Sequence, residues 1–412
     1  MTLYAALSAL LLASAPAAGA DTAWLASWSA SPQAVWSNDF ILPANVPARL
    51  HDQTVRQVAR VSLGGQRVRI VLSNAHGATP LTIGAATLAL AAEGSAIVPG
   101  SLRAVTFGGH SGATIAPGAP LLSDPVALGV PDLTRLAVSI HVPQDTAITT
   151  FHWDGRETAW IAPGQQTGAG SLDETRATST TARLLLSSIQ VEATAATQAV
   201  AVIGDSITDG AGASLGRDTR WPDVLAERLA PHGVAVINAG ISGARLLADG
   251  MGSNALARLE RDVLGQPGVR TVMIALGIND ISWPGTAFDP HGRRPTLEAL
   301  TAGYRQLTAQ ARSRGVRVIV ATLTPFEGAL PGTPLADYYQ PEKEALRQRL
   351  NAWIRGSGSF DGVLDADALL RDPVHPSRLL PAYDSGDHLH PGDAGNRALA
   401  AAVDLRVLIA EP

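Results

Sequence analysis

The sequence predicts an antiparallel β-sandwich of jelly-roll type, residues 21–192, followed by an α/β domain with a parallel sheet, residues 199–412. Two observations carry this prediction. The first part holds short alternating apolar and polar runs separated by Gly, Pro and Asn, which is typical of antiparallel strands. The second part alternates apolar runs with helical patterns, as βαβ units do. A total of 412 residues also favours two globular units over one.

In the first part, the clearest alternation lies at 67–72 and 136–142, where every second residue is suited to a buried sheet face. Further strands are predicted at 55–63, 81–90, 102–107 and 184–191. Residues 193–198, rich in Ala and Thr, read as the linker between the two domains.

In the second part, β-branched runs predict parallel strands and amphipathic runs predict the helices between them. The strands are expected at 200–203, 235–238, 271–276, 317–322 and 362–365. The helices are expected at 221–230, 255–264, 296–314, 342–354 and 393–409. Two long loops, 282–295 and 325–341, should rim the end of the sheet where ligands bind.

Residues 199–210, AVAVIGDSITDG, organise the whole chain. An apolar strand ends at Gly204, and the following turn presents Ser206 as a candidate nucleophile. A serine hydroxyl needs a base and an orienting carboxylate. The segment DSGDHLHPG near the carboxyl terminus supplies Asp387 and His390 in a loop before the last helix.

Two further strand ends lie between these segments. The first reads VAVINAGISG and offers the Gly240 amide, and the second reads VMIALGIND and offers the Asn279 side chain. Reactions through a tetrahedral intermediate need preorganised donors at the developing oxyanion. We therefore expect the amides of Ser206 and Gly240 and the NH2 group of Asn279 to form an oxyanion hole.

Taken together, Gly204-Asp205-Ser206, Gly240, Gly277-Ile278-Asn279-Asp280 and Asp387 to His390 with Pro391 resemble the four blocks of the SGNH, or GDSL-type, esterases and lipases. The resemblance covers residues 197–412 and implies a flavodoxin-like three-layer α/β/α fold. It implies Ser206 as nucleophile, His390 as base and Asp387 as its orienter. It also selects His390 over the neighbouring His388.

The composition excludes some classes of binding partner and indicates a cellular compartment. A net charge of −5 with no basic run argues against a nucleic-acid partner. Residues 1–20 have an apolar middle and end Ala-Gly-Ala, which predicts a cleaved signal peptide, a secreted or periplasmic protein and no transmembrane segment in the mature chain. The chain has no cysteine, so no disulfide or thiolate site is available, and we expect neither a cofactor nor a metal.

The expected activity is hydrolysis of short-chain carboxylic esters, including acetylated carbohydrates or aryl esters. Both rim loops are dense in Gly and Pro and lack a helical pattern for a lid, which predicts a small open pocket, with Trp283 as a candidate lining residue. The alternatives are a lipase or lysophospholipase of the same family and, from another class, a carbohydrate-binding adhesin with an inactive hydrolase half.

Three sets of charged residues are interpreted as structural. The charged run 258–262 is interpreted as a solvated helix face, and Asp205 and Asp209 are interpreted as structural turn residues.

Overall fold

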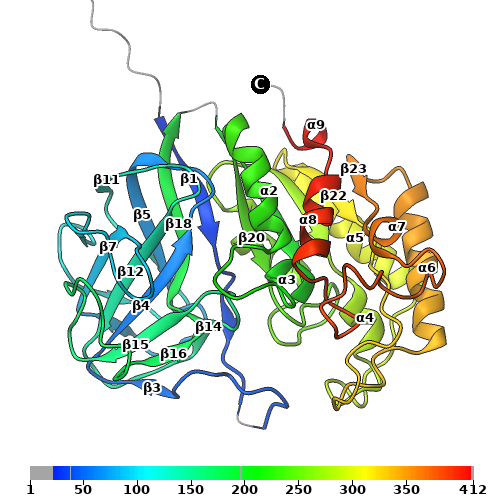
Figure 1. The fold of residues 1–412 in the computed structure, drawn as a ribbon, viewed down its shortest axis with the longest axis horizontal. Helices are drawn as coiled ribbons and strands as arrows, with labels where there is room; N and C mark the ends of the chain where they lie inside the picture. The colour runs from blue at the N-terminus through cyan, green and yellow to red at the C-terminus, as the bar shows by residue number, and fades with distance from the viewer. Residues whose placement is uncertain (1–21, 38, 195–196, 410–412) are drawn as a thin grey trace, which may run out of the picture.

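The computed structural model describes residues 22–37, 39–194 and 197–409. Figure 1 shows a β-rich half, residues 22–194, lying beside an α/β half, residues 197–409. The predicted signal peptide lies outside the described residues, as do positions 195 and 196 of the predicted linker.

Two antiparallel sheets form most of the β-rich half. One has the order β1 (Thr22–Ser29), β18 (Leu186–Thr194), β5 (Gly65–Ser73) and β10 (Pro120–Leu122), with β11 (Val126–Val130) also paired to β5. The other has the order β16 (Thr178–Thr180), β15 (Ala159–Pro163), β4 (Gln53–Arg60), β12 (Arg135–Val142), β7 (Ala85–Leu90) and β8 (Arg103–Val105). Three short sheets complete the β-rich half. One has the order β17 (Arg183–Leu184), β14 (Thr150–His152) and β2 (Gln33–Ala34). The other two are the pairs β3 (Arg49–Leu50) with β13 (Thr146–Ala147) and β6 (Leu81–Ile83) with β9 (Ala113–Ile115).

The alternation in the sequence sets which face of each sheet is buried. In β5, Val68, Ile70 and Leu72 are fully buried and share one core with Val138 and Ile140 of β12 in the opposite sheet. The two sheets therefore pack face to face as the predicted sandwich. The single strand predicted at 81–90 is two strands, because β6 pairs with β9 whereas β7 pairs with β12.

Five parallel strands form the sheet of the α/β half. Their order is β20 (Val234–Gly240), β19 (Gln198–Gly204), β21 (Val269–Ala275), β22 (Arg317–Ala321) and β23 (Gly362–Leu364). Counted along the chain this is the order 2-1-3-4-5 of flavodoxin-like sheets, which bind ligands beyond the carboxyl end of the first strand. The first strand here is β19, so the topology directs attention to the residues that follow Gly204.

Helices cover both faces of this sheet, as the red, green and yellow ribbons of Figure 1 show. Val200 and Val202 of β19 pack under α2 and α8, whereas Ala201 and Ile203 share the core that includes α3 and α5. The helical elements are α1 (Ser206–Asp209), α2 (Trp221–Leu229), η1 (Ala230–His232), α3 (Ala255–Leu259), η2 (Glu260–Leu264), α4 (Ile278–Ser282), α5 (Leu297–Ser313), α6 (Pro341–Gly356), α7 (Ala366–Leu370), α8 (Asp393–Ala402) and α9 (Leu405–Leu408). The helix predicted over 393–409 is broken after α8, because Asp404 caps the separate helix α9. Among the described residues, no helix is long and apolar enough to cross a membrane.

The two halves share one buried core. The hydrophobic cluster that fills the sandwich continues without a break into the α/β half. Polar contacts also cross the boundary: Ser29 Oγ donates to the Asn238 carbonyl at 2.9 Å, and Val236 N–H donates to Ser62 Oγ at 3.0 Å. Both contacts reach β20, the edge strand of the parallel sheet, so the β-rich half is fixed against the strand next to β19.

Candidate active site

Ser206 lies at the carboxyl end of β19, where the chain turns into α1. A Cβ atom at Gly204 would lie 2.0 Å from Thr208 Oγ1, so only glycine fits this turn. The Asp205 carboxylate accepts the Ile207 N–H at 3.1 Å and caps the helix. Burial raises the pKa of Asp205 to about 7, which agrees with a structural carboxyl group in the turn.

The structure brings Ser206, His390 and Asp387 into one hydrogen-bonded chain. His390 Nε2 lies 2.8 Å from Ser206 Oγ, and His390 Nδ1 lies 2.6 Å from Asp387 Oδ2. The other carboxylate oxygen, Asp387 Oδ1, accepts the N–H groups of Leu389 and His390. Burial alone would raise the pKa of Asp387, but the bonds and the charge of His390 hold it well below its usual range. The carboxylate therefore stays ionised and accepts from Nδ1, which leaves Nε2 facing the Ser206 hydroxyl.

The neighbouring His388 is directed elsewhere. Its side chain is half exposed and its Nδ1 contacts Asp384. His388 also adopts a φ of 61°, which turns the backbone between it and His390. The loop thus places one histidine on Ser206 and the other at the surface, as the sequence prediction required.

Asn279 stands in α4, after the end of β21. Its Oδ1 accepts a hydrogen bond from Tyr338 Oη at 2.7 Å, and its Nδ2 donates to the Ala244 carbonyl at 3.0 Å. Burial raises the pKa of Tyr338 well above its usual value, so its hydroxyl remains a donor and fixes which end of the amide carries the NH2 group. One N–H of Nδ2 is used by Ala244, and the other is available to a ligand of the pocket that Ser206 and Asn279 line. Sequence reasoning missed Tyr338, which comes from the distant loop 325–341.

The prediction for Gly240 is wrong. Gly240 is the last residue of β20, and its N–H already donates to Asn238 Oδ1 at 2.8 Å. Gly243 takes its place in the pocket wall beside Ser206 and Asn279. Its φ of 72° favours glycine, and neither its N–H nor that of Ser206 has a hydrogen-bond acceptor among the described residues. The sequence held a signal for it, since Gly243 also follows the strand, three residues later.

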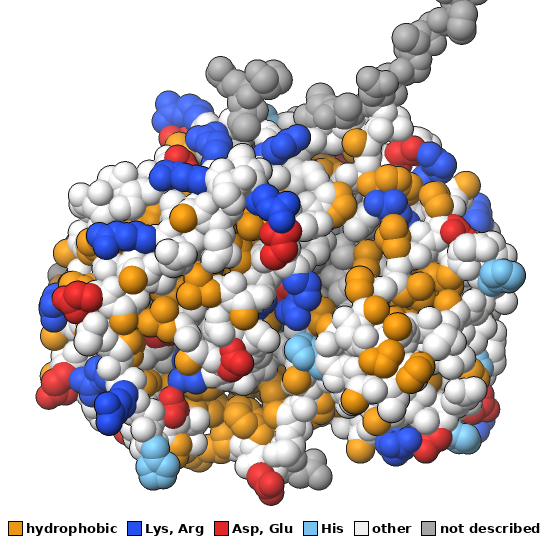
Figure 2. All heavy atoms as spheres, turned by 180° about the vertical axis from the view of Figure 1, so that it is seen from behind, with side chains coloured by type: hydrophobic (Ala, Val, Ile, Leu, Met, Phe, Trp, Pro, Cys, Tyr) orange, Lys and Arg blue, Asp and Glu red, His pale blue; other side chains and the backbone are white. Residues whose placement is uncertain are grey.

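A pocket of about 370 Å³ opens over Ser206. This volume lies in the range of small-molecule sites and exceeds what a two-carbon acyl group alone fills. Its wall is mostly apolar and comes from both halves, and Figure 2 shows hydrophobic side chains gathered along the lower edge of the α/β half, next to the boundary with the β-rich half. The lining residues outside the hydrogen-bonded chain include Ile41, Leu42, Trp153, Asp154, Arg156, Met251, Trp283, Phe288, Leu330, Leu335 and Leu389.

Trp283 forms part of this wall, where the sequence placed it as a candidate. Its side chain is 2% exposed, its ring stacks on Phe288 at 4.5 Å between centroids, and the Arg245 guanidinium lies 5.0 Å from the ring. The two rim loops, 282–295 and 325–341, both reach the pocket. Within them, helix is present only at Ser282, the end of α4, and at Pro341, the start of α6.

The interpretation of the charged run 258–262 as a solvated face holds for Glu260, which is exposed, but is wrong for Arg258 and Asp262. Arg258 and Asp262 are buried, and Arg258 donates to the carbonyls of Gly204 and Ala239 at 3.1 and 2.6 Å. These carbonyls end β19 and β20, so the guanidinium ties together the two strand ends that carry the site. Asp262 lies 3.2 Å from the same guanidinium and balances its charge.

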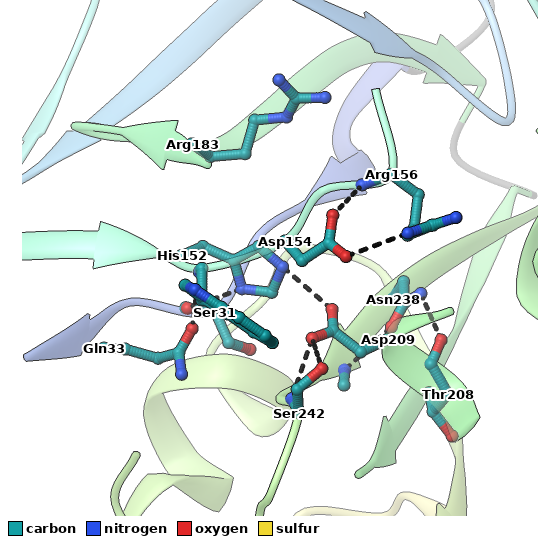
Figure 3. A network of polar contacts seen from close by, with 12 residues as sticks. Ser31, Gln33, His152, Asp154, Arg156, Arg183, Thr208, Asp209, Asn238 and Ser242 are labelled. Carbon is teal, nitrogen blue, oxygen red and sulfur yellow. Dashed lines mark hydrogen bonds and ion pairs between the residues drawn. The ribbon is translucent and has the colours of Figure 1, made fainter. Parts of the chain in front are cut away.

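Asp209, at the far end of α1 from Ser206, is the centre of a second polar network, drawn in Figure 3. Its Oδ2 accepts both the N–H and the hydroxyl of Ser242, at 2.8 and 2.7 Å. Its Oδ1 lies 2.9 Å from Nε2 of His152, which belongs to β14 of the β-rich half. Asp209 is structural, as predicted, but its partners lie far from it in the sequence.

The chain resembles known proteins over its α/β half. Residues 202–398 match the family model described as GDSL-like Lipase/Acylhydrolase family. No curated protein matches the chain. Similar solved structures include an acetylxylan esterase from Geobacillus stearothermophilus, 25% identical, covering 51% of this chain and 94% of that one with a TM-score of 0.38. Another is a GDSL-like lipase from Bacteroides thetaiotaomicron, 18% identical, covering 51% and 88% of the two chains with a TM-score of 0.37.

Proposed function

We propose that the protein is a serine esterase that hydrolyses short-chain carboxylic esters through an acyl-enzyme intermediate, in keeping with the match of residues 202–398 to the GDSL-like lipase/acylhydrolase family. The observation that carries the proposal is the hydrogen-bonded chain from Ser206 Oγ through His390 to Asp387, with bonds of 2.8 and 2.6 Å. Because these three side chains are hydrogen-bonded to one another, the alternative of an adhesin with an inactive hydrolase half is disfavoured.

The mechanism follows from these three side chains. Ser206 Oγ attacks the ester carbonyl carbon while His390 Nε2 takes the hydroxyl proton. The tetrahedral intermediate collapses when His390 returns that proton to the leaving alcohol, and the acyl group stays on Ser206. A water molecule then attacks the acyl-enzyme with His390 again as base, which releases the carboxylic acid and restores the serine. Asp387 orients the imidazole and stabilises its cation.

Three donors are placed to stabilise the oxyanion: the N–H groups of Ser206 and Gly243 and the free N–H of Asn279 Nδ2. All three residues line the same pocket. The donors of Asn279 and Gly243 are held before the substrate arrives, because Tyr338 and Ala244 fix the amide of Asn279 and Asp209 fixes the turn at Ser242. Such preorganisation is the usual source of the largest electrostatic term in acyl transfer.

The proposed substrate has a short acyl chain and an alcohol that fills the rest of the pocket. The lid-free rim loops favour this choice, and the volume of 370 Å³ leaves room for an aryl or sugar alcohol. The apolar lining supports one alternative, a lipase or lysophospholipase of the same family, in which a longer acyl chain occupies that space. Residues 1–20 support export, so we place the enzyme in the periplasm or outside the cell.

The test compares wild type with Ser206→Ala on p-nitrophenyl esters from acetate to palmitate. We expect wild-type kcat/KM to be highest between two and four carbons and the variant to lose about 10⁶-fold in kcat while its circular dichroism is unchanged. Wild-type turnover by Ser206→Ala would refute the mechanism. A maximum at ten carbons or more would refute the short-chain assignment and favour the lipase.

A further inference from the structure

The β-rich half supplies part of the pocket that holds Ser206. Ile41, Leu42 and Trp153 line it together with residues of the α/β half. An aromatic series crosses the boundary, with ring centroids 5.7 Å apart from Trp153 to Trp36 and again from Phe40 to Phe288. The segment before β3 is thereby held over the pocket of the other half.

One contact ties this wall to the loop that carries His390. The Arg156 guanidinium, three residues after Trp153 in the chain, donates to the Ala213 carbonyl. The adjoining Gly212 lies against His390, since a Cβ atom there would be 3.1 Å from the His390 Cβ. Because His390 gives its proton to the leaving alcohol, we expect the wall tied to its loop to receive the alcohol.

The chemistry of this wall selects the alcohol. Ile41, Leu42 and Trp153 offer apolar surface. The two charges at its edge neutralise each other, because Arg156 Nη1 lies 3.3 Å from Asp154 Oδ2. Resting on the proposed esterase function, we propose that the β-rich half forms the alcohol subsite of the pocket and selects esters of neutral, apolar, ring-sized alcohols.

The test uses two acetates that differ only in the alcohol, methyl acetate and 2-naphthyl acetate. Ile41→Asp places a charge on the wall at a side chain that is 38% exposed, and Val98→Asp is the matched control, equally exposed on the β-rich half and outside the pocket lining. We expect Ile41→Asp to lower kcat/KM for 2-naphthyl acetate about tenfold and for methyl acetate less than twofold, because losing one apolar contact in a pocket changes kcat/KM by about tenfold or more. Val98→Asp should change neither. Equal losses on both esters, or no loss, would overturn the subsite.

A second measurement needs no turnover. Calorimetry of 2-naphthol binding in the Ser206→Ala background should show about tenfold weaker binding with Ile41→Asp and unchanged binding with Val98→Asp. Unchanged binding in both variants would overturn the subsite. If the ring binds as expected but wild type hydrolyses neither acetate, the esterase function fails while the apolar subsite stands.

A different observation, the network of Figure 3, carries a second inference. His152 is 4% exposed, and its Nδ1 lies 3.2 Å from the Ser31 carbonyl while its Nε2 lies 2.9 Å from Asp209 Oδ1. The imidazole thus joins the backbone of the β-rich half to Oδ1 of Asp209, an oxygen that receives no hydrogen bond from any described residue. Asp209 is therefore a buried side chain packed against a ring from the other half of the chain.

The second carboxylate oxygen of Asp209, Oδ2, holds the backbone at Ser242, beside the active site. It takes two hydrogen bonds from Ser242, the residue before Gly243. A carboxylate that rotated toward solvent or another partner would release both bonds and with them the direction of the Gly243 N–H. We infer that His152 is a positioning residue that acts through Asp209 on the Gly243 oxyanion donor.

His141 provides the matched control. Its Nε2 also lies 2.9 Å from an aspartate oxygen, that of Asp52, within the β-rich half. We expect His152→Gln to lower kcat about tenfold with KM within twofold, a fraction of the loss from deleting an oxyanion donor, and His152→Ala to lower kcat further. His141→Gln should change neither constant. A rise in KM alone, or equal effects of the two Gln variants, would overturn the assignment.

Hydrogen–deuterium exchange tests the same inference without a substrate. Peptides that cover residues 240–246 should exchange faster in His152→Gln than in wild type and remain unchanged in His141→Gln. Unchanged exchange in His152→Gln would overturn the inference. Faster exchange in a protein that hydrolyses no ester would leave the link from His152 to this turn in place and remove the esterase function.

Discussion

Two histidine–aspartate pairs lie at opposite ends of α1. At its first residue, His390 contacts Ser206 and is held by Asp387 within the same loop. At its last residue, Asp209 lies against His152, which comes from the other half of the chain. The first pair is three residues apart in the sequence and the second 57. The residues that carry out the reaction thus come from a local sequence motif, whereas the pair that positions the site forms only when the two halves of the fold come together.

The largest expected effect tests the first pair. His390→Ala removes the base, and we expect kcat to fall about 10⁶-fold, as in other serine hydrolases that lose one triad member. Steady-state kinetics on p-nitrophenyl acetate gives the value. A loss no greater than that of His152→Ala would erase the distinction between the two pairs.

Asp387→Asn comes next, with an expected loss of about 10⁴-fold because the amide no longer fixes the imidazole tautomer. Since the pKa of Asp387 lies well below its usual range, wild type should keep this carboxylate ionised across the whole range of activity. Single-turnover kinetics of both variants gives the ranking. A larger loss for Asp387→Asn than for His390→Ala would require a new assignment of the base.

The first pair could be predicted from the sequence because each member follows an element that the chain itself encodes. Ser206 ends a strand, and Asp387 and His390 share one loop before a helix. The prediction of Gly240 as an oxyanion donor failed because of one hydrogen bond. The Gly240 N–H already donates to the side chain of Asn238, two residues earlier.

The second pair could not be predicted from the sequence. No local pattern shows that Asp209 meets β14, or that Ile41 reaches the pocket from the β-rich half. The same long-range packing buries Arg258 against two strand ends, although its charged neighbours suggested a solvated helix. Burial imposed by a distant segment leaves no periodic signal in the sequence.

Asn279→Ala should have an intermediate effect. Loss of one oxyanion donor costs about 3 kcal/mol, or roughly 10²-fold in kcat, with little change in KM. In a double-mutant cycle with His152→Gln, the two losses should be less than additive, because both act on the same oxyanion. Strict additivity would indicate that the second pair does not reach the oxyanion hole.

The last expected effect is on stability, not on turnover, and concerns Asp205. Burial raises its pKa to about 7 from 3.8, so the folded state binds this proton more tightly than the unfolded state. Its contribution to stability is therefore present below pH 3.8 and lost as the pH rises through 7. Asp205→Asn cannot titrate, and the unfolding free energy of the variant relative to wild type should increase by about 1.4 kcal/mol per pH unit in that window. Urea titrations at pH 5 and pH 8 measure it, and a constant difference would contradict the buried, protonated carboxyl.

Covalent capture of the nucleophile tests most directly whether Ser206 is the nucleophile of an esterase. The protein is treated with a fluorophosphonate at neutral pH, digested, and mapped by mass spectrometry, with His390→Ala and His152→Gln in parallel. We expect one label, on Ser206, formed rapidly in wild type, more slowly in His152→Gln and almost undetectably in His390→Ala. No label, or a label on another residue of wild type, would contradict the assignment of Ser206 as the nucleophile of an esterase.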